Sequence, residues 1–471
     1  MTAIRTHLLI AASVTALVAC AVGPDYRRPT LPAGADAPMV SINKEAEASI
    51  AVPDDWWRLY QDPKLNDLLE EAFKANYDLK AAEANLSASR AVLDASRAGL
   101  YPSTNANVGA IRGRNATTDQ ILEVGGHEPK TTWSYDAILD VSYEIDLFGH
   151  VRRSIEASQA DAQGVQAARD AVKITVAAET ARAYGQICSL GEEIEVAQHS
   201  VDVVTHEADI VHRRMLAGGG SEFEFVRASG LIAQVRATVA PLEGQRDAAL
   251  FQLAALLGRT PANAPVETLQ CHSPPRLSKL IPVGDGVGLL RRRPDIRQAE
   301  RRVAGDTARV GVATADLYPR ISLLGSVGGV GGQLSALTAA RGLTWGLGPS
   351  ISWTFPNQIL SRARVKQAGA LADQSLANFD STVLQALKET EQALATYNAE
   401  LIQRESLNDA QRLAHREFSL AKEQFSYGAI SSLDMLTSEQ SMVASDAAVA
   451  ASDARTLQAQ IQLFKSLGGG W

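Results

Sequence analysis

The three cysteines at positions 20, 188 and 271 are the side chains of this 471-residue chain best suited to covalent chemistry. Cys188 lies within a long helical pattern, and Cys271 lies in the loop that leads to Pro274. In an oxidising compartment these two thiols could form a disulfide. Two separate thiols are the simpler interpretation, which we favour. Cys271-His272 predicts no metal site, because no second ligand pair follows at zinc spacing.

Other chemistries find little support in the sequence. The glycine-rich run 325–332 imitates a phosphate-binding loop, but it lies in a strand and loop pattern and opens no helix. The 8 histidines are scattered and no nucleophile elbow occurs, so no catalytic residues are assigned and we expect no enzyme. The net charge of −8 argues against a general nucleic-acid binder.

The first 19 residues have the pattern of a signal peptide. Arg5 supplies the positive charge, and residues 8–18 form the apolar run. The Leu-Val-Ala-Cys sequence that ends at Cys20 resembles the bacterial lipobox, which predicts a covalent lipid on Cys20 and no other cofactor. An ordinary signal peptide with an incidental cysteine is the alternative. Ala21 is not the aspartate that favours inner-membrane retention, so we expect an outer-membrane location.

The chain contains an internal duplication. Residues 78–102 align on 295–319 at an offset of 217, and both blocks end in Leu-Tyr-Pro. Residues 218–258 align on 428–468 at an offset of 210. Repeated blocks of this kind indicate repeated structural units. We place the two structural repeats at residues 61–275 and 276–471.

Each repeat contains apolar residues that alternate with polar ones. The pattern is strong at 133–147 and 343–355, and weaker at 101–111 and 320–330, which we interpret as hairpin partners. The strong runs exceed the roughly 9–11 residues that a tilted strand needs to cross a bilayer. A soluble sandwich is the alternative, but two long strands per repeat are too few to build one. We therefore predict four membrane strands per chain.

Four strands cannot close a barrel, because the smallest membrane barrels need about eight. An open sheet in lipid would leave backbone groups without hydrogen bonds. The strands must therefore be pooled between chains. Three chains would supply the strands of a 12-stranded β-barrel, so we expect a homotrimer in contact with outer-membrane lipid.

Long helices are predicted on either side of the strands. Residues 150–216 contain no proline and have a heptad-like seam, so they would extend about 100 Å. Residues 361–427 form the counterpart, and the shorter helices 79–99 and 222–257 would stack end to end beside the long ones. Such columns favour a closed tube, an α-barrel, over a plain coiled-coil rod, which would not explain the strands. The helical regions span 149–257 and 361–467.

Several short runs together resemble one family. They are Val22–Pro29, the Trp56-Trp57 pair, Leu289–Glu300 and the closing Leu467–Trp471. These runs resemble the TolC-like outer-membrane factors, in particular the NodT/OprM-type lipoprotein branch of RND efflux systems. The resemblance implies that residues 20–60 wrap around a collar of the helical part and that the arginines at 291–293 make structural contacts there.

The same resemblance implies a function and partners. The chain would be the outer-membrane channel of a tripartite efflux system that exports small toxic or drug-like molecules. An inner-membrane RND-type transporter would supply the energy, and a periplasmic adaptor would connect the two, with the helical part in the periplasm. A duct for type I protein secretion and a structural envelope lipoprotein are the alternatives.

Two turns have glycine and serine at equivalent positions, Gly218 and Ser221 in the first repeat and Gly428 and Ser431 in the second. The glycine is suited to end one helix and the serine to cap the next. The resemblance implies that both turns form the periplasmic tip and contact the adaptor.

Two acidic residues follow these turns. Asp434 matches the family's tip aspartate, and Glu224 takes its place in the first repeat. The resemblance implies that these carboxylates narrow a periplasmic gate. Favourable electrostatics at the start of a helix is the alternative explanation, and the sequence leaves both open.

Overall fold

A computed structural model describes residues 21–41, 46–47, 53–114, 124, 131–277, 281–283 and 286–469. The predicted signal peptide and Cys20 lie outside the described residues. The chain divides into two compact units, which we describe separately. The strand unit comprises Met1–Pro29, Leu86–Val165 and Ala299–Phe379, and the helix unit comprises Thr30–Asn85, Gln166–Gln298 and Asp380–Trp471.

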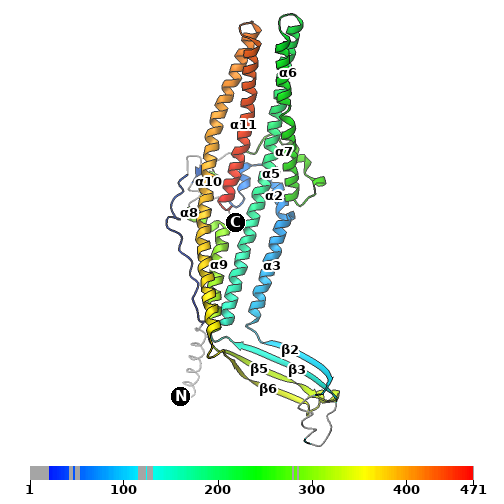
Figure 1. The fold of residues 1–471 in the computed structure, drawn as a ribbon, viewed down its shortest axis with the longest axis vertical. Helices are drawn as coiled ribbons and strands as arrows, with labels where there is room; N and C mark the ends of the chain where they lie inside the picture. The colour runs from blue at the N-terminus through cyan, green and yellow to red at the C-terminus, as the bar shows by residue number, and fades with distance from the viewer. Residues whose placement is uncertain are drawn as a thin grey trace. The chain divides into compact units, whose positions relative to one another are not determined.

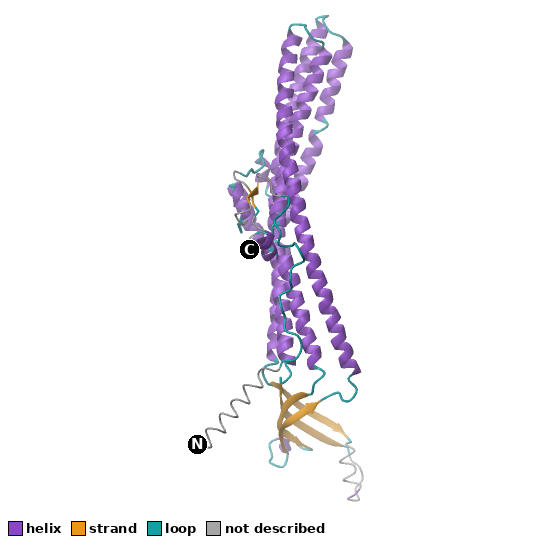
Figure 2. Cartoon of the chain, turned by 90° about the vertical axis from the view of Figure 1, so that its left-hand side faces the viewer, coloured by secondary structure: helices purple, strands orange, loops and turns teal. Residues whose placement is uncertain are grey.

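The strand unit contains one antiparallel sheet of four strands (Figure 1, and orange in Figure 2). Its order is β2-β3-β5-β6. The strands are β2 (Ser103–Gly113), β3 (Thr132–Ile145), β5 (Arg320–Gly331) and β6 (Leu343–Ser352). The alternation predicts all four strands, and the observed ends differ from the predicted ones by at most three residues.

The register places the apolar positions of neighbouring strands on one face. Leu139 of β3 lies opposite Val327 of β5, which lies opposite Trp345 of β6. Asp140, the next residue of β3, lies opposite Ser326 on the other face. Because side chains alternate along a strand, the Leu139 face of the sheet is mainly apolar and the Asp140 face mainly polar, with exceptions such as Ile138 and Leu324 on the polar face.

The helices follow the same order in both halves of the chain, except that α11 of the second half corresponds to α6 and α7 of the first (Figure 1). In the first half they are α2 (Pro63–Ala75), α3 (Tyr77–Ala98), α5 (His150–Leu216), α6 (Glu222–Arg236) and α7 (Val239–Leu256). In the second half they are α8 (Gly286–Arg292), α9 (Pro294–Ala315), α10 (Ile359–Ser426) and α11 (Ser432–Ser466). Short elements complete the fold: η1 (Trp56–Tyr60), η2 (Pro261–Asn263), η3 (Val266–Gln270), η4 (Leu334–Leu337), and β1 (Ala46–Glu47) paired with β4 (Ile281–Pro282).

The single helix predicted over 222–257 is wrong, because the segment forms two helices. α6 ends at Arg236 and α7 begins at Val239. Pro241 lies in the first turn of α7. It has no N–H to donate, and its ring would clash with a helical carbonyl at Ala237 four residues earlier. The continuous series of helical backbone hydrogen bonds is therefore interrupted just before Pro241.

In the strand unit, the N-terminal segment is held by polar contacts to α5 and α9. Arg153, whose side chain is 7% exposed, pairs with Asp25 at 2.6 Å. Glu300 accepts a hydrogen bond from the Tyr26 hydroxyl at 3.0 Å and pairs with Arg28 at 3.2 Å. Burial, with help from Glu300, raises the pKa of Tyr26 to about 12. The Val22–Pro29 run thus has a structural role on these helices.

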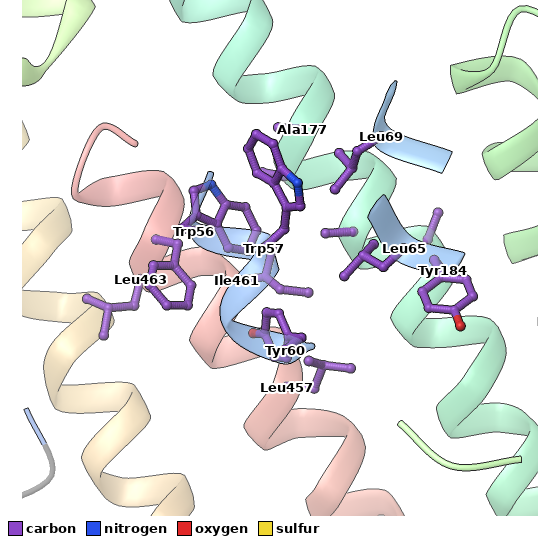
Figure 3. Packing of buried hydrophobic residues seen from close by; sticks show 14 of the residues in the cluster. Trp56, Trp57, Tyr60, Leu65, Leu69, Ala177, Tyr184, Leu457, Ile461 and Leu463 are labelled. Atoms are coloured by element: carbon purple, nitrogen blue, oxygen red, sulfur yellow. The ribbon is translucent and has the colours of Figure 1, made fainter. Parts of the chain in front are cut away.

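The helix unit has an aromatic core supplied by η1 (Figure 3). Trp56 is 1% exposed and stacks on Phe464 of α11, with ring centroids 4.7 Å apart. Tyr60 donates from its hydroxyl to Gln460 of the same helix. Tyr184 of α5 enters the core beside the leucines of α2. The Trp56-Trp57 run therefore inserts between α11 and the first-repeat helices.

Cys188 and Cys271 form a disulfide, so the favoured interpretation of two separate thiols is wrong. Their Cα atoms are 4.7 Å apart. Cys188 is buried on α5, and the chain that follows η3 crosses α5 at Gly191. A Cβ at Gly191 would collide with the carbonyl oxygen of Cys271. The bare backbone of this glycine lets the loop approach closely enough for the bond to form.

Candidate functional site

The helix unit joins short helices end to end through one side chain in each repeat. In the first joint, Asn76 precedes α3. Its side-chain nitrogen donates to the Leu256 carbonyl at the end of α7, at 3.0 Å. Its side-chain oxygen accepts from the Leu79 N–H in the first turn of α3, also at 3.0 Å. One buried amide therefore satisfies a free carbonyl of one helix and a free N–H of the next, as the predicted end-to-end stacking requires.

In the second joint, Arg293 takes the equivalent position before α9. Its Nη1 donates to the Ser466 carbonyl at the end of α11, at 2.9 Å. Its Nη2 donates to Asp295 at 2.7 Å and to Glu389 of α10 at 2.8 Å. Position 293 lies 217 residues after 76, and 466 lies 210 after 256, which are the offsets of the two repeated blocks. The joint is therefore duplicated with the chain.

Glycines allow these joints to close. Gly258 follows α7 with φ +67°, and Gly468 follows α11 with φ +81°. A Cβ at Gly258 would meet the carbonyl oxygen of Ala75, and one at Gly468 would meet Arg293. A left-handed glycine is a common helix ending, and here the missing side chain also makes room for the neighbouring helix.

The two predicted turns lie at the same end of the helix unit (Figures 1 and 2). In the first, Gly218 has φ +76° after α5. Ser221 caps α6: its side chain accepts from the Glu224 N–H at 3.3 Å, and the Glu224 carboxylate accepts from the Ser221 N–H at 2.9 Å. This reciprocal pair is a capping box.

The second turn repeats the arrangement. Gly428 has φ +72° after α10. The Ser431 hydroxyl accepts from the Asp434 N–H at 3.2 Å, and the Asp434 carboxylate accepts from the Ser431 N–H at 3.1 Å. The hydrogen bonds from Ser431 lower the pKa of Asp434. Each acid therefore contacts its own serine, and no described contact joins Asp434 to Glu224.

Close to these turns lies a buried charged cluster that the sequence interpretation missed. Glu439 of α11 is 0% exposed, and Glu207 of α5 is 2% exposed. Lys422 of α10 pairs with Glu207 at 2.6 Å. The sequence does contain a pattern that indicates the burial of Glu439. This residue lies four residues after Met435 and three before Met442, which places it on the apolar face of its helix.

Among the described residues, the structure contains no helix with the length and apolar character needed to span a membrane. Within the same part of the chain, no three or more His, Cys, Asp or Glu side chains form a group that could hold a metal ion.

Comparisons with known proteins agree over the length of the chain. Residues 68–259 and 288–469 match the family model described as outer membrane efflux protein. The pyoverdine export outer membrane protein OpmQ of Pseudomonas aeruginosa is 30% identical over 431 residues, covering 88% of this chain and 87% of that protein. The cation efflux system protein CusC of Escherichia coli O157:H7 is 27% identical, covering 97% of each chain.

A solved structure of the outer-membrane channel OprN has a TM-score of 0.87, with 32% sequence identity, and covers 96% of this chain and 100% of that one. The predicted fold class is thereby confirmed: long helices of an α-barrel and four strands per chain for the β-barrel of a trimeric channel. The chain belongs to the outer membrane efflux protein family, and it is an outer-membrane channel component of an efflux system.

Proposed function

We propose that this channel is the outer-membrane duct of a tripartite pump that exports small toxic or drug-like molecules. An RND-type transporter in the inner membrane supplies the energy, and a periplasmic adaptor connects it to the channel. The observation that carries the proposal is similarity along nearly the whole chain to proteins named for pyoverdine export and for cation efflux. Both of those cargoes are small compared with a secreted protein.

A deletion strain tests this function. We expect greater sensitivity to members of a panel of organic drugs, solvents and metal salts, restored by the wild-type gene. Deletion of the proposed adaptor and transporter should give the same sensitivity profile. Unchanged sensitivity with loss of a protein from the culture medium would instead support a type I secretion duct. Envelope defects without channel conductance in a planar bilayer would support a structural lipoprotein.

We also propose that Cys20 anchors the mature chain through lipid. Mass spectrometry of the purified protein should find an N-terminus at Cys20 that carries a diacylglycerol on sulfur and an acyl group on the amine. Cys20→Ser should slow maturation or misplace the protein while the trimer still forms. An unmodified N-terminus or cleavage at another residue contradicts the proposal.

The apolar face of the sheet is expected to meet lipid. Leu139→Arg should lower the stability of the trimer by about 2–4 kcal/mol if the residue lies near the bilayer midplane, because a charge would be placed in hydrocarbon. Asp140→Arg, on the opposite face, is the matched control and should cost far less. Denaturant titration of the reconstituted trimer measures both. Equal losses would mean that the lipid-facing side has been assigned wrongly.

At the other end of the molecule, we propose that the turns containing Gly218, Ser221, Gly428 and Ser431 contact the adaptor, and that Asp434 and Glu224 line the periplasmic gate. In a trimer the two acids would supply six carboxylates around one opening. The hydrogen bonds from Ser431 lower the pKa of Asp434, so this group stays ionised at neutral pH unless the crowded ring opposes it. Such a ring would attract cations.

Asp434→Asn combined with Glu224→Gln should therefore reduce cation selectivity and weaken block by divalent or trivalent cations added on the periplasmic side. These amides keep the shape of the capping box and remove the charge. Ser431→Ala is the control, because it weakens the cap by about 1 kcal/mol and leaves the charge in place. Single-channel recording measures both properties. If the double variant behaves like the wild type, the two acids serve the helix starts alone.

A further inference from the structure

The carboxyl group of Glu439 is buried without a hydrogen-bond partner. The residue is the eighth of α11 and is 0% exposed, and neither of its carboxylate oxygens has a partner among the described residues. Side chains of the same protomer already cover this carboxyl group completely. Another protomer of the trimer therefore cannot contact it while the helices are packed in this way. An ionised carboxylate without a partner is costly in apolar surroundings. The packed structure therefore favours the neutral acid.

Among the described residues, no cation on the neighbouring helices pairs directly with Glu439. Lys422 of α10 is committed to Glu207 of α5, with 2.6 Å between Nζ and Oε1. Arg214 of α5 lies over the Phe425 ring, 4.9 Å from its centroid. α6 contributes apolar side chains, among them Leu231, to the core that contains Met435 and Leu436.

Burial first, and the charge of Glu207 second, raise the pKa of Glu439 from 4.5 to about 7, while Lys422 opposes the shift. A second ionisable pair lies seven residues further along α11, where the His415 ring nitrogen of α10 meets Asp446 at 2.6 Å. Any pH measurement must therefore distinguish the titration of Glu439 from the effects of four other charged or titratable groups, which are Glu207, Lys422, His415 and Asp446.

We propose that Glu439 is a protonation latch: with its proton in place the ends of α5, α10 and α11 next to the two turns stay packed, and loss of the proton loosens them. The latch rests on the proposed function, because it would act on the gate that we assign to the same turns. Glu439 follows Asp434 by five residues on α11. Displacement of these first turns would therefore move the carboxylate of Asp434.

The structure also indicates how the latch would open. An ionised Glu439 needs water, and a hollow of about 530 Å³ beside the cluster is lined by Glu207, Lys422 and Met435. Water entering there would solvate the carboxylate once α11 moves. If the carboxyl group has its ordinary pKa of 4.5 when loosened and about 7 when packed, the ratio of loosened to packed tip rises up to tenfold per pH unit between these values and levels off above pH 7.

The test uses the full-length trimer in a planar bilayer, with conductance recorded from pH 5 to pH 8. We expect the wild-type open fraction to rise with pH and level off above pH 7. Glu439→Gln and Glu439→Met, which carry no ionisable group, should remove this step and stay at the low-pH level. His415→Gln should keep the step. A step that persists in both Glu439 variants, or disappears in His415→Gln, would overturn the proposal.

Hydrogen exchange separates failure of the latch from failure of the channel assignment. Protection of the backbone amides at 433–442, corrected for intrinsic exchange rates, should fall in the wild-type trimer as pH rises to 7 and stay constant in Glu439→Gln. A trimer that conducts but shows the same protection profile in both proteins rules out the latch alone. A trimer that never conducts contradicts the proposed function, and the exchange profile still decides whether the latch exists.

Discussion

Replacing Arg293 with methionine is expected to lower the free energy of unfolding by about 1–3 kcal/mol, the usual cost of removing the hydrogen-bond partner of a buried polar group. The guanidinium pairs with Asp295 and Glu389 and donates to the carbonyl of Ser466. Burial opposes the charge, but these two acids together raise the pKa of Arg293, so it is charged whenever the protein is folded. The variant would leave two carboxylates and a helix-ending carbonyl without this partner.

Arg291 offers a matched control, because it belongs to the same run of three arginines and is exposed. Arg291→Met should change stability by less than about 0.5 kcal/mol, as is usual at the surface. Denaturant unfolding at one fixed protein concentration measures both, since the stability of an oligomer depends on concentration. Similar effects of the two changes would show that the second joint does not depend on Arg293.

Loss of the Cys188–Cys271 disulfide is expected to lower the free energy of unfolding by about 4 kcal/mol, because a bond that spans 83 residues restricts the unfolded chain considerably. Cys271→Ser is the variant of choice, since Cys271 is partly exposed and Cys188 is fully buried. Unfolding curves with and without reductant measure the effect.

The wild-type protein under reducing conditions should unfold like Cys271→Ser under either condition. Reductant should have no effect on the variant itself, which serves as the control for side reactions. If reductant leaves the wild-type curve unchanged while free-thiol titration confirms reduction, the bond contributes nothing to stability and the loop is held by its other contacts.

Much of the fold follows from local patterns. Alternation identified the four strands because a membrane sheet must present one apolar face, and the register sets Leu139 beside Val327 accordingly. The turns were also readable, since left-handed glycine and capping serine are local requirements that Gly428 and Ser431 satisfy within a few residues. The break before α7 was equally local: Pro241 signals it, and the prediction overlooked that signal.

The sequence by itself therefore determined the duplicated plan, the strands, the long helices and the capped turns, because each depends on neighbours close along the chain. Only the tertiary structure decided the roles of Arg293, Cys271 and Glu439. Arg293 meets the end of a helix 173 residues away, and Cys271 bonds where Gly191 lets a loop approach. Glu439 becomes a titratable group of unusual pKa only when three helices exclude water from it. Burial and long-range pairing arise from packing, and packing is not encoded in the spacing of any one segment.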